Sequence, residues 1–328
     1  MILIQKINYF CNSNTTIREL KVYHSLEDFE KLNNAVVTTG TFDGVHVGHQ
    51  SILKRLSEIS KQENGESVLI TFFPHPRMVL QSDMDLKLLN TISEKISLLS
   101  KTGIDHLIIY PFTKEFSRMS SVDFVRDILV NRIGTKKLVI GYDHQFGRNR
   151  EGSFEHLKEY GPVYGFDVEE IPVKDIEDIS VSSTKIRNSL LLDGDVKTAG
   201  KYLGMEYHIS GKVVEGIQLG SKIGYPTANI EIEEDYKLIP KDGVYAVRVE
   251  IDKANYIGML NIGNRPTISG TNRTIEVNIF DFSGKIYDQS IKIFFAERIR
   301  DEKKFDTINK LRAQLSLDEI KAKDFFQK

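Results

Sequence analysis

The stretch Thr39-Gly40-Thr41-Phe42-Asp43-Gly44-Val45-His46-Val47-Gly48-His49 decides the fold of the first half of this chain. It follows the apolar run Ala35-Val36-Val37 and precedes Ser51-Ile52-Leu53-Lys54-Arg55-Leu56, whose apolar residues have helical spacing. These patterns predict a strand, a glycine-containing turn and a helix, in that order. The two histidines then lie where the helix begins.

A helix start of this kind is suited to binding an anion. Its first backbone N–H groups have no partner within the helix, and the helix dipole is positive at that end. Gly48 leaves room for a phosphate near the backbone, and charged His46 and His49 can donate hydrogen bonds to phosphoryl oxygens. This chemistry fits attack on the α-phosphate of a nucleoside triphosphate. The pattern is weak by itself, because either histidine could be a hydrogen-bonded turn residue.

Composition limits the class of protein. The chain has 328 residues, enough for two domains, and its 40% hydrophobic and 27% charged residues are typical of a soluble globular protein. The formal net charge of −2 gives no sign of nucleic-acid binding. A single cysteine excludes an internal disulfide framework and a cysteine-based zinc site. Because we find no apolar segment of membrane-spanning length and no signal peptide, we expect a cytoplasmic protein.

From about residue 35 to residue 172, short apolar runs alternate with amphipathic helical stretches. The expected strands are Ala35–Gly40, Ser67–Phe73, His106–Tyr110, Lys137–Gly141 and Phe166–Ile171, and the expected helices begin near Gly48, Ile92, Ser120 and Ser153. This alternation predicts an α/β domain of Rossmann-like type, with a parallel sheet and helices on both faces. Ligands of such sheets bind outside the carboxyl ends of the strands, which is where the histidine stretch falls.

The pattern changes after about residue 205, where period-two segments without intervening helices predict an antiparallel β-barrel or sandwich. The expected strands are Met205–Val214, Gly243–Ile251, Tyr256–Ile262, Thr274–Phe280 and Gln289–Phe295. Residues 302–327 predict a terminal helix that covers a sheet with Phe305, Ile308, Leu311, Leu317, Ile320 and Phe325. The predicted domains are 1–185 and 205–328, joined by a helical linker over 186–204.

Three further motifs in the first half point to the same end of the sheet. Two prolines fix Pro74-His75-Pro76-Arg77 in a rigid turn, where His75 and Arg77 either face the cleft or cap a loop. The loop Gly141–Arg150 combines glycines, aromatic rings and the carboxylate of Asp143, which favours a binding loop. Ser182-Ser183-Thr184-Lys185-Ile186-Arg187 begins a helix with hydroxyls and cations. Since cations oppose the dipole there, a bound triphosphate explains them better than a stabilising role does.

In the second half, the stretch Gly220–Asn229 carries most of the candidate chemistry. Thr227 and Asn229 are hard oxygen ligands on one side of an extended segment, and they fit Mg²⁺ with phosphate and water. Lys222 and the glycines suit a loop that covers phosphate, although a purely structural turn fits equally well. Glu276 lies in an apolar strand. It is a candidate base for a substrate hydroxyl if it faces a cleft, and an ordinary solvated residue if it faces outward.

Taken together, these motifs resemble the family of bacterial bifunctional riboflavin kinase/FMN adenylyltransferases, also called FAD synthetases. The resemblance runs from Val36 to Phe326. The motifs that carry it, in family order, are Gly40-x-Phe42-Asp43-Gly44-Val45-His46-x-Gly48-His49, Thr71-Phe72-x-Pro74-His75-Pro76-Arg77, Gly141-x-Asp143-x-x-Phe146-Gly147, Ser182-Ser183-Thr184-x-Ile186-Arg187, Gly224-Tyr225-Pro226-Thr227-Ala228-Asn229, Asp242-Gly243-Val244-Tyr245, Asn261-Ile262-Gly263-Asn264-Arg265-Pro266-Thr267 and Glu276.

The resemblance implies two reactions that use ATP. The C-terminal barrel would phosphorylate riboflavin to FMN with Mg²⁺, and the N-terminal domain would adenylylate FMN to FAD and release pyrophosphate. The implied catalytic residues are His46, His49, Arg187 and Glu276. The implied ATP or phosphate contacts are Gly40, Phe42, Asp43, Gly48, Ser182, Ser183, Thr184, Lys222, Gly224, Thr227 and Asn229, of which Thr227 and Asn229 also hold the metal. The implied flavin contacts are His75, Arg77, Asp143, Phe146, Asn264 and Arg265.

Some positions depart from the family pattern. His144 replaces a phenylalanine, Asn278 a histidine, Lys222 an arginine and Asp288 a glycine. They leave open a second reading, a monofunctional FMN adenylyltransferase whose barrel binds flavin without activity. A non-enzymatic adaptor for nucleic acid is disfavoured by the near-neutral charge, and a class I aminoacyl-tRNA synthetase by the lack of a basic tract. We expect small molecules as partners, no nucleic acid or membrane, and a monomer or weak homo-oligomer.

Overall fold

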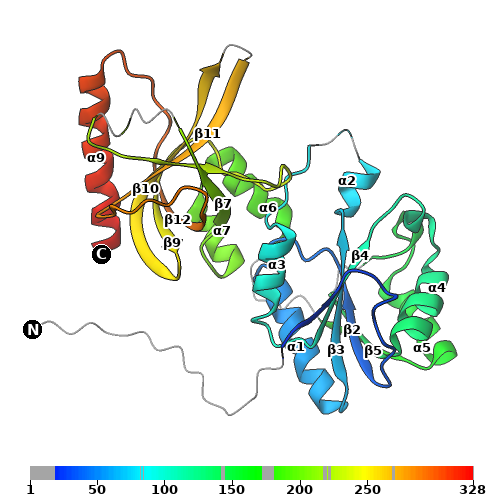
Figure 1. Cartoon of the computed structure of the whole chain (residues 1–328). Coiled ribbons are helices and arrows are strands. Elements are labelled where there is room, and N and C mark those ends of the chain that lie inside the picture. The colour runs from blue at the N-terminus through cyan, green and yellow to red at the C-terminus, as the bar shows by residue number, and fades with distance from the viewer. Residues whose placement is uncertain are drawn as a thin grey trace, which may run out of the picture.

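The computed structural model describes residues 19–327 apart from 82, 84, 142–144, 172–180, 217–219, 221–222 and 268–269, and between residues 265 and 272 it describes no side chain. Figure 1 shows two units: a sheet flanked by helices, and a barrel with one long helix against it. Helices α6 and α7 lie between them.

The N-terminal unit contains β1 (Lys21–Tyr23), β2 (Ala35–Thr39), α1 (Val47–Gln62), β3 (Glu66–Phe73), α2 (Pro76–Leu80), α3 (Ile92–Leu99), β4 (His106–Pro111), η1 (Phe116–Arg118), α4 (Ser121–Asp123), η2 (Phe124–Ile133), β5 (Thr135–Gly141), η3 (Arg148–Arg150), α5 (Phe154–Tyr164) and β6 (Asp167–Ile171). Its six strands are parallel and lie in the order β1-β4-β3-β2-β5-β6. The predicted parallel sheet is confirmed. The short β1 at its edge was not predicted.

Helices cover both faces of this sheet, and the residues of β2 show why. Val36 packs with Leu53 and Leu56 of α1 on one face. Ala35 and Val37 pack on the opposite face against η2 and α5. Successive strand residues point to opposite faces, so a strand buried on both sides is a continuous apolar run. The strand order reverses between β2 and β5, and the crevice at the carboxyl ends of those strands is the expected ligand position.

A helical segment made of α6 (Ser183–Asn188), η5 (Ser189–Asp193) and α7 (Val196–Leu203) leads to the second unit. It ties the two units together. Gln50 at the start of α1 donates from Nε2 to the carbonyl of Leu203, at 2.9 Å. Ile186 and Leu190 are fully buried in the same cluster as the interior of the barrel. The helical segment and the barrel therefore share one hydrophobic core.

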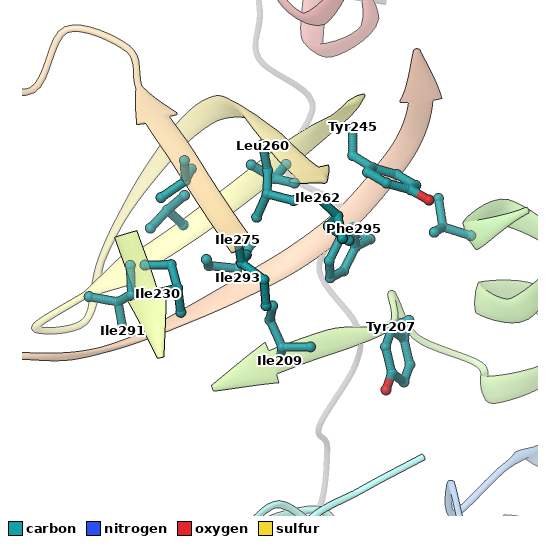
Figure 2. Packing of buried hydrophobic residues seen from close by; sticks show 14 of the residues in the cluster. Tyr207, Ile209, Ile230, Tyr245, Leu260, Ile262, Ile275, Ile291, Ile293 and Phe295 are labelled. Atoms are coloured by element: carbon teal, nitrogen blue, oxygen red, sulfur yellow. The ribbon is translucent and has the colours of Figure 1, made fainter. Parts of the chain in front are cut away.

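The second unit is a closed barrel of β7 (His208–Val214), β8 (Ala228–Glu231), β9 (Gly243–Ile251), β10 (Ala254–Thr267), β11 (Gly270–Ile279) and β12 (Ser290–Arg300), in the order β10-β11-β8-β7-β12-β9. Its pairings are antiparallel, as predicted. Tyr245, Val247 and Val249 lie in its buried interior, which confirms the period-two pattern of that strand. Figure 2 shows Tyr245 and Tyr207 among the aliphatic side chains that fill the barrel.

The terminal helix α9 (Ile308–Gln327) differs from the prediction in its start and in its buried face. Residues 302–307 are not helical, and Ile308, Leu317 and Ile320 are exposed. The helix packs on the barrel with the predicted Phe325 and also with Leu315, Ala322 and Phe326. Its buried row includes a charged residue, Asp318, which is fully buried. This carboxylate made the true face hard to see in the sequence.

Asp318 is buried because it meets a cation. Arg300 at the end of β12 donates from Nε and Nη2 to its carboxylate at 2.7–3.0 Å. Gln314 donates to the same group at 2.9 Å. A bidentate pair of this kind fixes the orientation of α9 against the barrel rim.

Replacing Asp318 by alanine should therefore lower the free energy of unfolding by about 3–5 kcal/mol, because the variant leaves a guanidinium partly buried without its partner. Urea denaturation followed by circular dichroism would measure this loss. The matched control is Asp306→Ala, which removes an exposed carboxylate paired with Lys310 at 3.1 Å and should cost about 0.5 kcal/mol or less. Equal losses in the two variants would show that the buried pair does not hold the helix.

Candidate active sites

The loop after β2 has an unusual backbone. Phe42 and Val45 adopt left-handed conformations, with φ of 44° and 43°, on either side of Gly44 at φ 86°. A Cβ at Gly44 would also lie 2.6 Å from Leu89 Cδ1, so only glycine fits there. At Gly40, a Cβ would lie 3.0 Å from the Phe42 ring, so a larger residue there would require that ring to shift. The loop thus turns tightly onto the start of α1.

His46 and His49 meet at that helix start. His46 is the N-cap residue of α1, and its Nδ1 accepts the backbone N–H of His49 at 3.4 Å. The two rings stack with centroids 3.6 Å apart, and Phe42 packs against His49 at 4.6 Å. The buried Nδ1 of His49 has no hydrogen-bond partner within the described part of the chain. The structure thus brings together the two histidines that the sequence analysis singled out.

Burial decides the charge of the His49 ring and of the His75 ring. Burial, the neighbouring His46 and the ammonium of Lys95 hold the pKa of His49 well below its ordinary value. Burial likewise lowers the pKa of His75 to about 4, although Asp43 opposes the shift. At neutral pH both imidazoles are therefore uncharged. The neutral ring of His49 offers one N–H donor, whereas the sequence analysis considered a charged ring.

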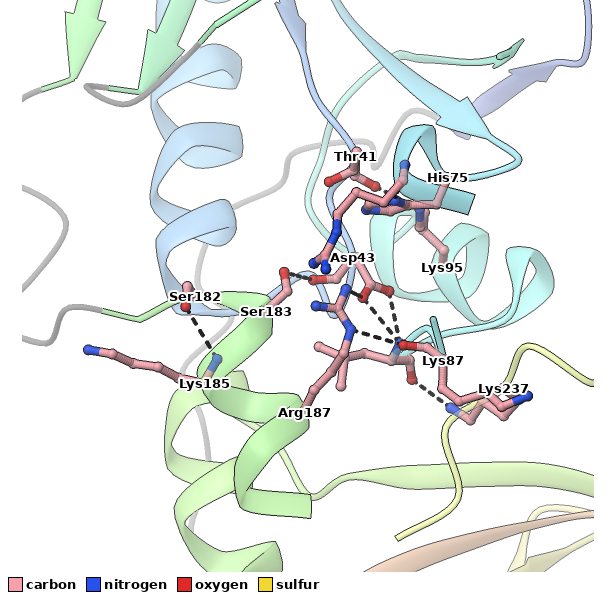
Figure 3. A network of polar contacts seen from close by, with 12 residues as sticks. Thr41, Asp43, His75, Lys87, Lys95, Ser182, Ser183, Lys185, Arg187 and Lys237 are labelled. Carbon is pink, nitrogen blue, oxygen red and sulfur yellow. Dashed lines mark hydrogen bonds and ion pairs between the residues drawn. The ribbon is translucent and has the colours of Figure 1, made fainter. Parts of the chain in front are cut away.

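Asp43 and Arg187 form the centre of a buried polar network (Figure 3). Arg187 donates from Nη2 to Asp43 Oδ2 at 2.6 Å and from Nε to the carbonyl of Lys87 at 2.9 Å. The Asp43 carboxylate, which is 1% exposed, also accepts the backbone N–H of Leu89 at 3.0 Å. The cation in the first turns of α6 is thus compensated by a protein carboxylate, whereas the sequence analysis assigned it to a triphosphate.

The hydroxyl residues before Arg187 lie beside this network. Ser182 is the N-cap residue of α6, and its Oγ accepts the N–H of Lys185 at 3.3 Å. Ser183 donates to the carbonyl of Asp43 at 2.9 Å, while Thr184 is exposed. The late Ser/Thr element therefore contacts the early histidine loop, as the pairing of the two motifs predicts.

The remaining candidates of this unit have varied environments. His75 is the N-cap residue of α2 and lies near enough to Asp43 and Arg187 to interact electrostatically with both. Arg77 donates from Nε to Gln81 at 3.3 Å. Phe146 packs on Phe124 with ring centroids 5.9 Å apart, within a core cluster of the sheet, so packing alone accounts for that ring. Gly48 is buried in the first turn of α1. Asp143 and His144 lie outside the described residues.

A second constellation lies on the barrel. Glu276 of β11 pairs in register with Asn229 of β8, so both side chains lie on one face of the sheet. Thr227 Oγ1 donates to Glu276 Oε2 at 3.4 Å, and Thr274 Oγ1 donates to Glu276 Oε1 at 3.3 Å. A Cβ at Gly216 would lie 2.0 Å from the Asn229 amide, so a glycine makes room for that side chain. The structure thus brings Thr227, Asn229 and Glu276 together.

Thr227 and Glu276 border a cavity of about 200 Å³ that reaches under α9. Its polar lining includes Thr227, Glu276, Asn278 and Asn261. Its apolar lining was missed in the sequence analysis as part of a site, and it consists of Ile223, Tyr225, Val244, Met259, Leu260, Phe305, Leu311 and Leu315. Period and spacing could not have found it, because the lining comes from segments that meet only when α9 docks.

The donor set at the cavity suits a hard cation with few protein ligands. Thr227, Asn229 and Glu276 present hydroxyl, amide and carboxylate oxygens, which are the atoms that Mg²⁺ prefers. Within the described residues, no group of three or more His, Cys, Asp or Glu side chains is arranged to hold a metal ion. The residues therefore fit Mg²⁺ that completes its shell with phosphate and water, and they do not fit a fully protein-ligated metal.

Two departures from the family pattern have local explanations. Asn278 donates from Nδ2 to the carbonyl of Pro226 at 2.6 Å, so it holds the residue before Thr227. Asp288 has φ 64°, which aspartate tolerates better than most residues, and it pairs with Lys212 at 2.8 Å.

The other candidates of the barrel are described in part. Asn264 donates to Asp242 at 2.6 Å. Gly224 has φ 88°, whereas Lys222 and the side chain of Arg265 lie outside the described part.

Comparison with known proteins bears on both sites. Residues 28–185 match the family described as FAD synthetase, and residues 203–326 match the family described as riboflavin kinase. A bifunctional riboflavin kinase/FMN adenylyltransferase of Buchnera aphidicola subsp. Schizaphis graminum is 37% identical over 94% of this chain and 99% of its own length. That of Escherichia coli K12 is 35% identical over 89% of this chain and 92% of its own length.

This chain belongs to the bifunctional riboflavin kinase/FMN adenylyltransferase family. It is a transferase with a unit for each activity: the N-terminal unit adenylylates FMN to FAD, and the barrel phosphorylates riboflavin to FMN. The monofunctional alternative is not supported. ATP, riboflavin and FMN are the substrates that these activities imply.

The fold agrees with a solved relative over nearly the whole chain. A crystal structure from Streptococcus pneumoniae, described as a macrolide-efflux protein, superposes with a TM-score of 0.82 at 33% identity and covers 91% of this chain and 97% of its own. In the described part of this family member, none of the helices combines the length and apolar character needed to cross a bilayer.

The neutral histidines make stability depend on pH. Burial lowers the pKa of both His75 and His208 to about 4, and a neighbouring Lys237 contributes at His208. In the unfolded chain these histidines have a pKa near 6.5. Between pH 6.5 and pH 4 the unfolded chain therefore binds more protons than the folded protein. The free energy of unfolding is highest above about pH 6.5 and decreases as the pH falls toward 4.

The free energy of unfolding should therefore be lower at pH 5 than at pH 7, by about 2 kcal/mol for each of these two histidines. Urea denaturation at both pH values would measure the difference. In His208→Gln the difference should shrink, while the exposed His156→Gln should leave it unchanged. An identical pH dependence in His208→Gln and the unaltered protein would contradict the assignment.

Proposed function

We propose that the loop after β2 and the start of α6 form the site of adenylyl transfer. In this site the phosphate of FMN attacks the α-phosphate of ATP, and pyrophosphate leaves. The attacking oxygen is already anionic, so the reaction needs alignment and charge stabilisation and no general base. The observation that carries the proposal is the stacked pair His46 and His49 at the start of a 16-residue helix, where the buried Nδ1 of His49 has no hydrogen-bond partner among the residues that the structure describes.

Each group in this site has a proposed role. The first N–H groups of α1 and the rings of His46 and His49 donate hydrogen bonds to phosphoryl oxygens. Ser182, Ser183 and Thr184 at the start of α6 contact the triphosphate from the other side. Asp43 and Arg187 act mainly on each other and hold the loop, which makes them positioning residues. His75 and Arg77 lie close enough to help bind the flavin or the nucleotide.

We propose that the barrel cavity beside Glu276 is the site of riboflavin phosphorylation. The carboxylate takes the proton of the ribityl 5′-hydroxyl as its oxygen attacks the γ-phosphate of ATP, and ADP leaves. The contacts to Thr227 and Thr274 orient the carboxylate. The apolar lining from Met259, Phe305, Leu311 and Leu315 fits one face of a flat aromatic ring such as isoalloxazine.

Thr227 and Asn229 would hold Mg²⁺ in this site, and the ion, when bound, supplies charge neutralisation for the phosphates of ATP. Lys222 and Gly224 belong to the loop that would cover those phosphates. Asn264 and Arg265 would contact the flavin from β10. Cytoplasmic location, small-molecule partners alone, and a monomeric or weakly associated state remain predictions from the sequence.

The defining experiment is a time course from riboflavin. The protein with riboflavin, MgATP and no other enzyme should form FMN first and FAD afterwards, as followed by chromatography. Formation of neither product would contradict the proposal. Omission of Mg²⁺ should stop the first reaction.

His49→Ala should lower the rate of FAD formation from FMN by about two powers of ten, because it removes a preorganised donor to the phosphoryl oxygens. Formation of FMN from riboflavin should stay unchanged. The control is His156→Ala, which alters an exposed histidine of α5 and should affect neither rate. Loss of both activities in a folded His49 variant would show that the sites are not separate.

Glu276→Ala should produce the opposite pattern. FMN formation should fall by about two or more powers of ten through loss of the base, while FAD formation from added FMN should persist. Glu231→Ala, an exposed carboxylate on β8, serves as the control. If FMN formation survives in Glu276→Ala, another group must accept the proton.

A further inference from the structure

The segment Lys87–Lys95 lies between the two units and touches both. On the barrel side, the N–H of Leu88 donates to the carbonyl of Tyr236 at 2.7 Å, and the N–H of Leu238 donates to the carbonyl of Leu88 at 2.8 Å. These bonds pair Leu88 with Lys237 in a short parallel bridge. A piece of the N-terminal unit is thereby hydrogen-bonded to the barrel unit as a strand would be.

The same segment holds the adenylyl-transfer loop on its other side. The N–H of Leu89 donates to the Asp43 carboxylate at 3.0 Å, and the carbonyl of Lys87 accepts from Arg187 at 2.9 Å. Lys95 donates from Nζ to the carbonyl of Thr41 at 2.7 Å. Asp43 and Thr41 are both in the loop that leads to the histidine pair. The segment therefore fixes that loop at several points.

One barrel side chain completes the connection. Lys237 is 2% exposed, and its Nζ donates to the carbonyl of Leu89 at 2.7 Å and to Glu94 Oε2 at 2.6 Å. Leu89 thus receives a hydrogen bond from the barrel at its carbonyl and gives one to Asp43 from its amide. Figure 3 shows Lys237 below this network, with its bond directed to the segment that reaches Asp43.

Glu94 and Lys95 extend this connection into α3. Glu94 forms a capping box with Thr91 at the start of the helix, and its Oε1 accepts the N–H of Ser210 on the barrel strand β7 at 3.1 Å. The next residue, Lys95, contacts the loop instead. Two neighbouring residues on one helical turn are therefore fixed to different units. A shift of the barrel at Glu94 would move α3, and with it the contact between Lys95 and the loop.

We propose that Lys237, a residue of the kinase unit, is a positioning residue for adenylyl transfer in the other unit. Its ammonium sets the place of Leu89 and Glu94, and through them the place of Asp43 and the histidine loop. This inference rests on the proposed function of that loop. The kinase cavity is separate from this connection: within the described residues, no hydrogen bond of the segment 87–95 reaches a residue that lines it.

The two activities of one chain provide the test. In full-length Lys237→Met, the kcat for FAD formation from FMN should fall at least tenfold, and the kcat for FMN formation from riboflavin should stay within twofold. A role in general stability alone would not change the ratio of the two rates. The control is Lys212→Met, which removes an exposed barrel lysine paired with Asp288 and should leave both rates unchanged.

Lys237→Met leaves Glu94 buried without its cation, so this variant could lose activity through misfolding. Two further variants separate that effect from the proposed role. Glu94→Gln keeps the size of the side chain, and the double variant Glu94→Gln/Lys237→Met removes both charges together. Each should lower FAD formation selectively, by fivefold or more. Equal losses in both activities, or no loss in the double variant, would overturn the proposal. Failure of the unaltered protein to convert FMN to FAD would instead overturn the proposed function.

Discussion

A single buried anion, the carboxylate of Asp43, constrains the arrangement of the whole N-terminal site. A charge removed from water needs a partner of opposite sign and hydrogen-bond donors, and Asp43 obtains them from Arg187 and from the amide of Leu89. These three residues come from the loop after β2, the segment before α3 and the helix α6. Satisfying one carboxylate therefore requires three distant parts of the chain to meet at one strand end, beside the two histidines.

The two sites handle charge in opposite ways. The proposed adenylyl-transfer loop would offer the neutral ring of His49 and helix N–H groups to substrates that are already anionic, so it would need no base, and the carboxylate of Asp43 is paired with Arg187. In the proposed barrel site, Glu276 lines a cavity and accepts hydrogen bonds from two threonine hydroxyls, an arrangement that suits the deprotonation of an alcohol. The fold separates these demands by placing one site on a parallel sheet and the other on a barrel.

Much of this could be predicted from local patterns. The parallel sheet, the antiparallel second unit and the meeting of the histidine and serine motifs follow from periodicity and from the rule that ligands bind at strand ends. What local patterns missed depended on contacts distant in sequence. The pairing of Arg187 with Asp43 joins residues 144 positions apart, and part of the buried face of α9 was misplaced because Asp318 is neutralised by Arg300. The lining by Leu311 and Leu315 is likewise visible only once α9 has docked.

The position of α9 has a consequence for the intermediate of the two reactions. This helix lies on the side of the barrel away from the parallel sheet (Figure 1), and the cavity beside Glu276 lies beneath it. Under the proposed function, FMN forms on the side of the barrel away from the histidine loop, so we expect it to diffuse through solvent before it reaches that loop of the same or another molecule. Any apoprotein that needs this nucleotide can compete for it on the way, which makes the enzyme a source of two coenzymes.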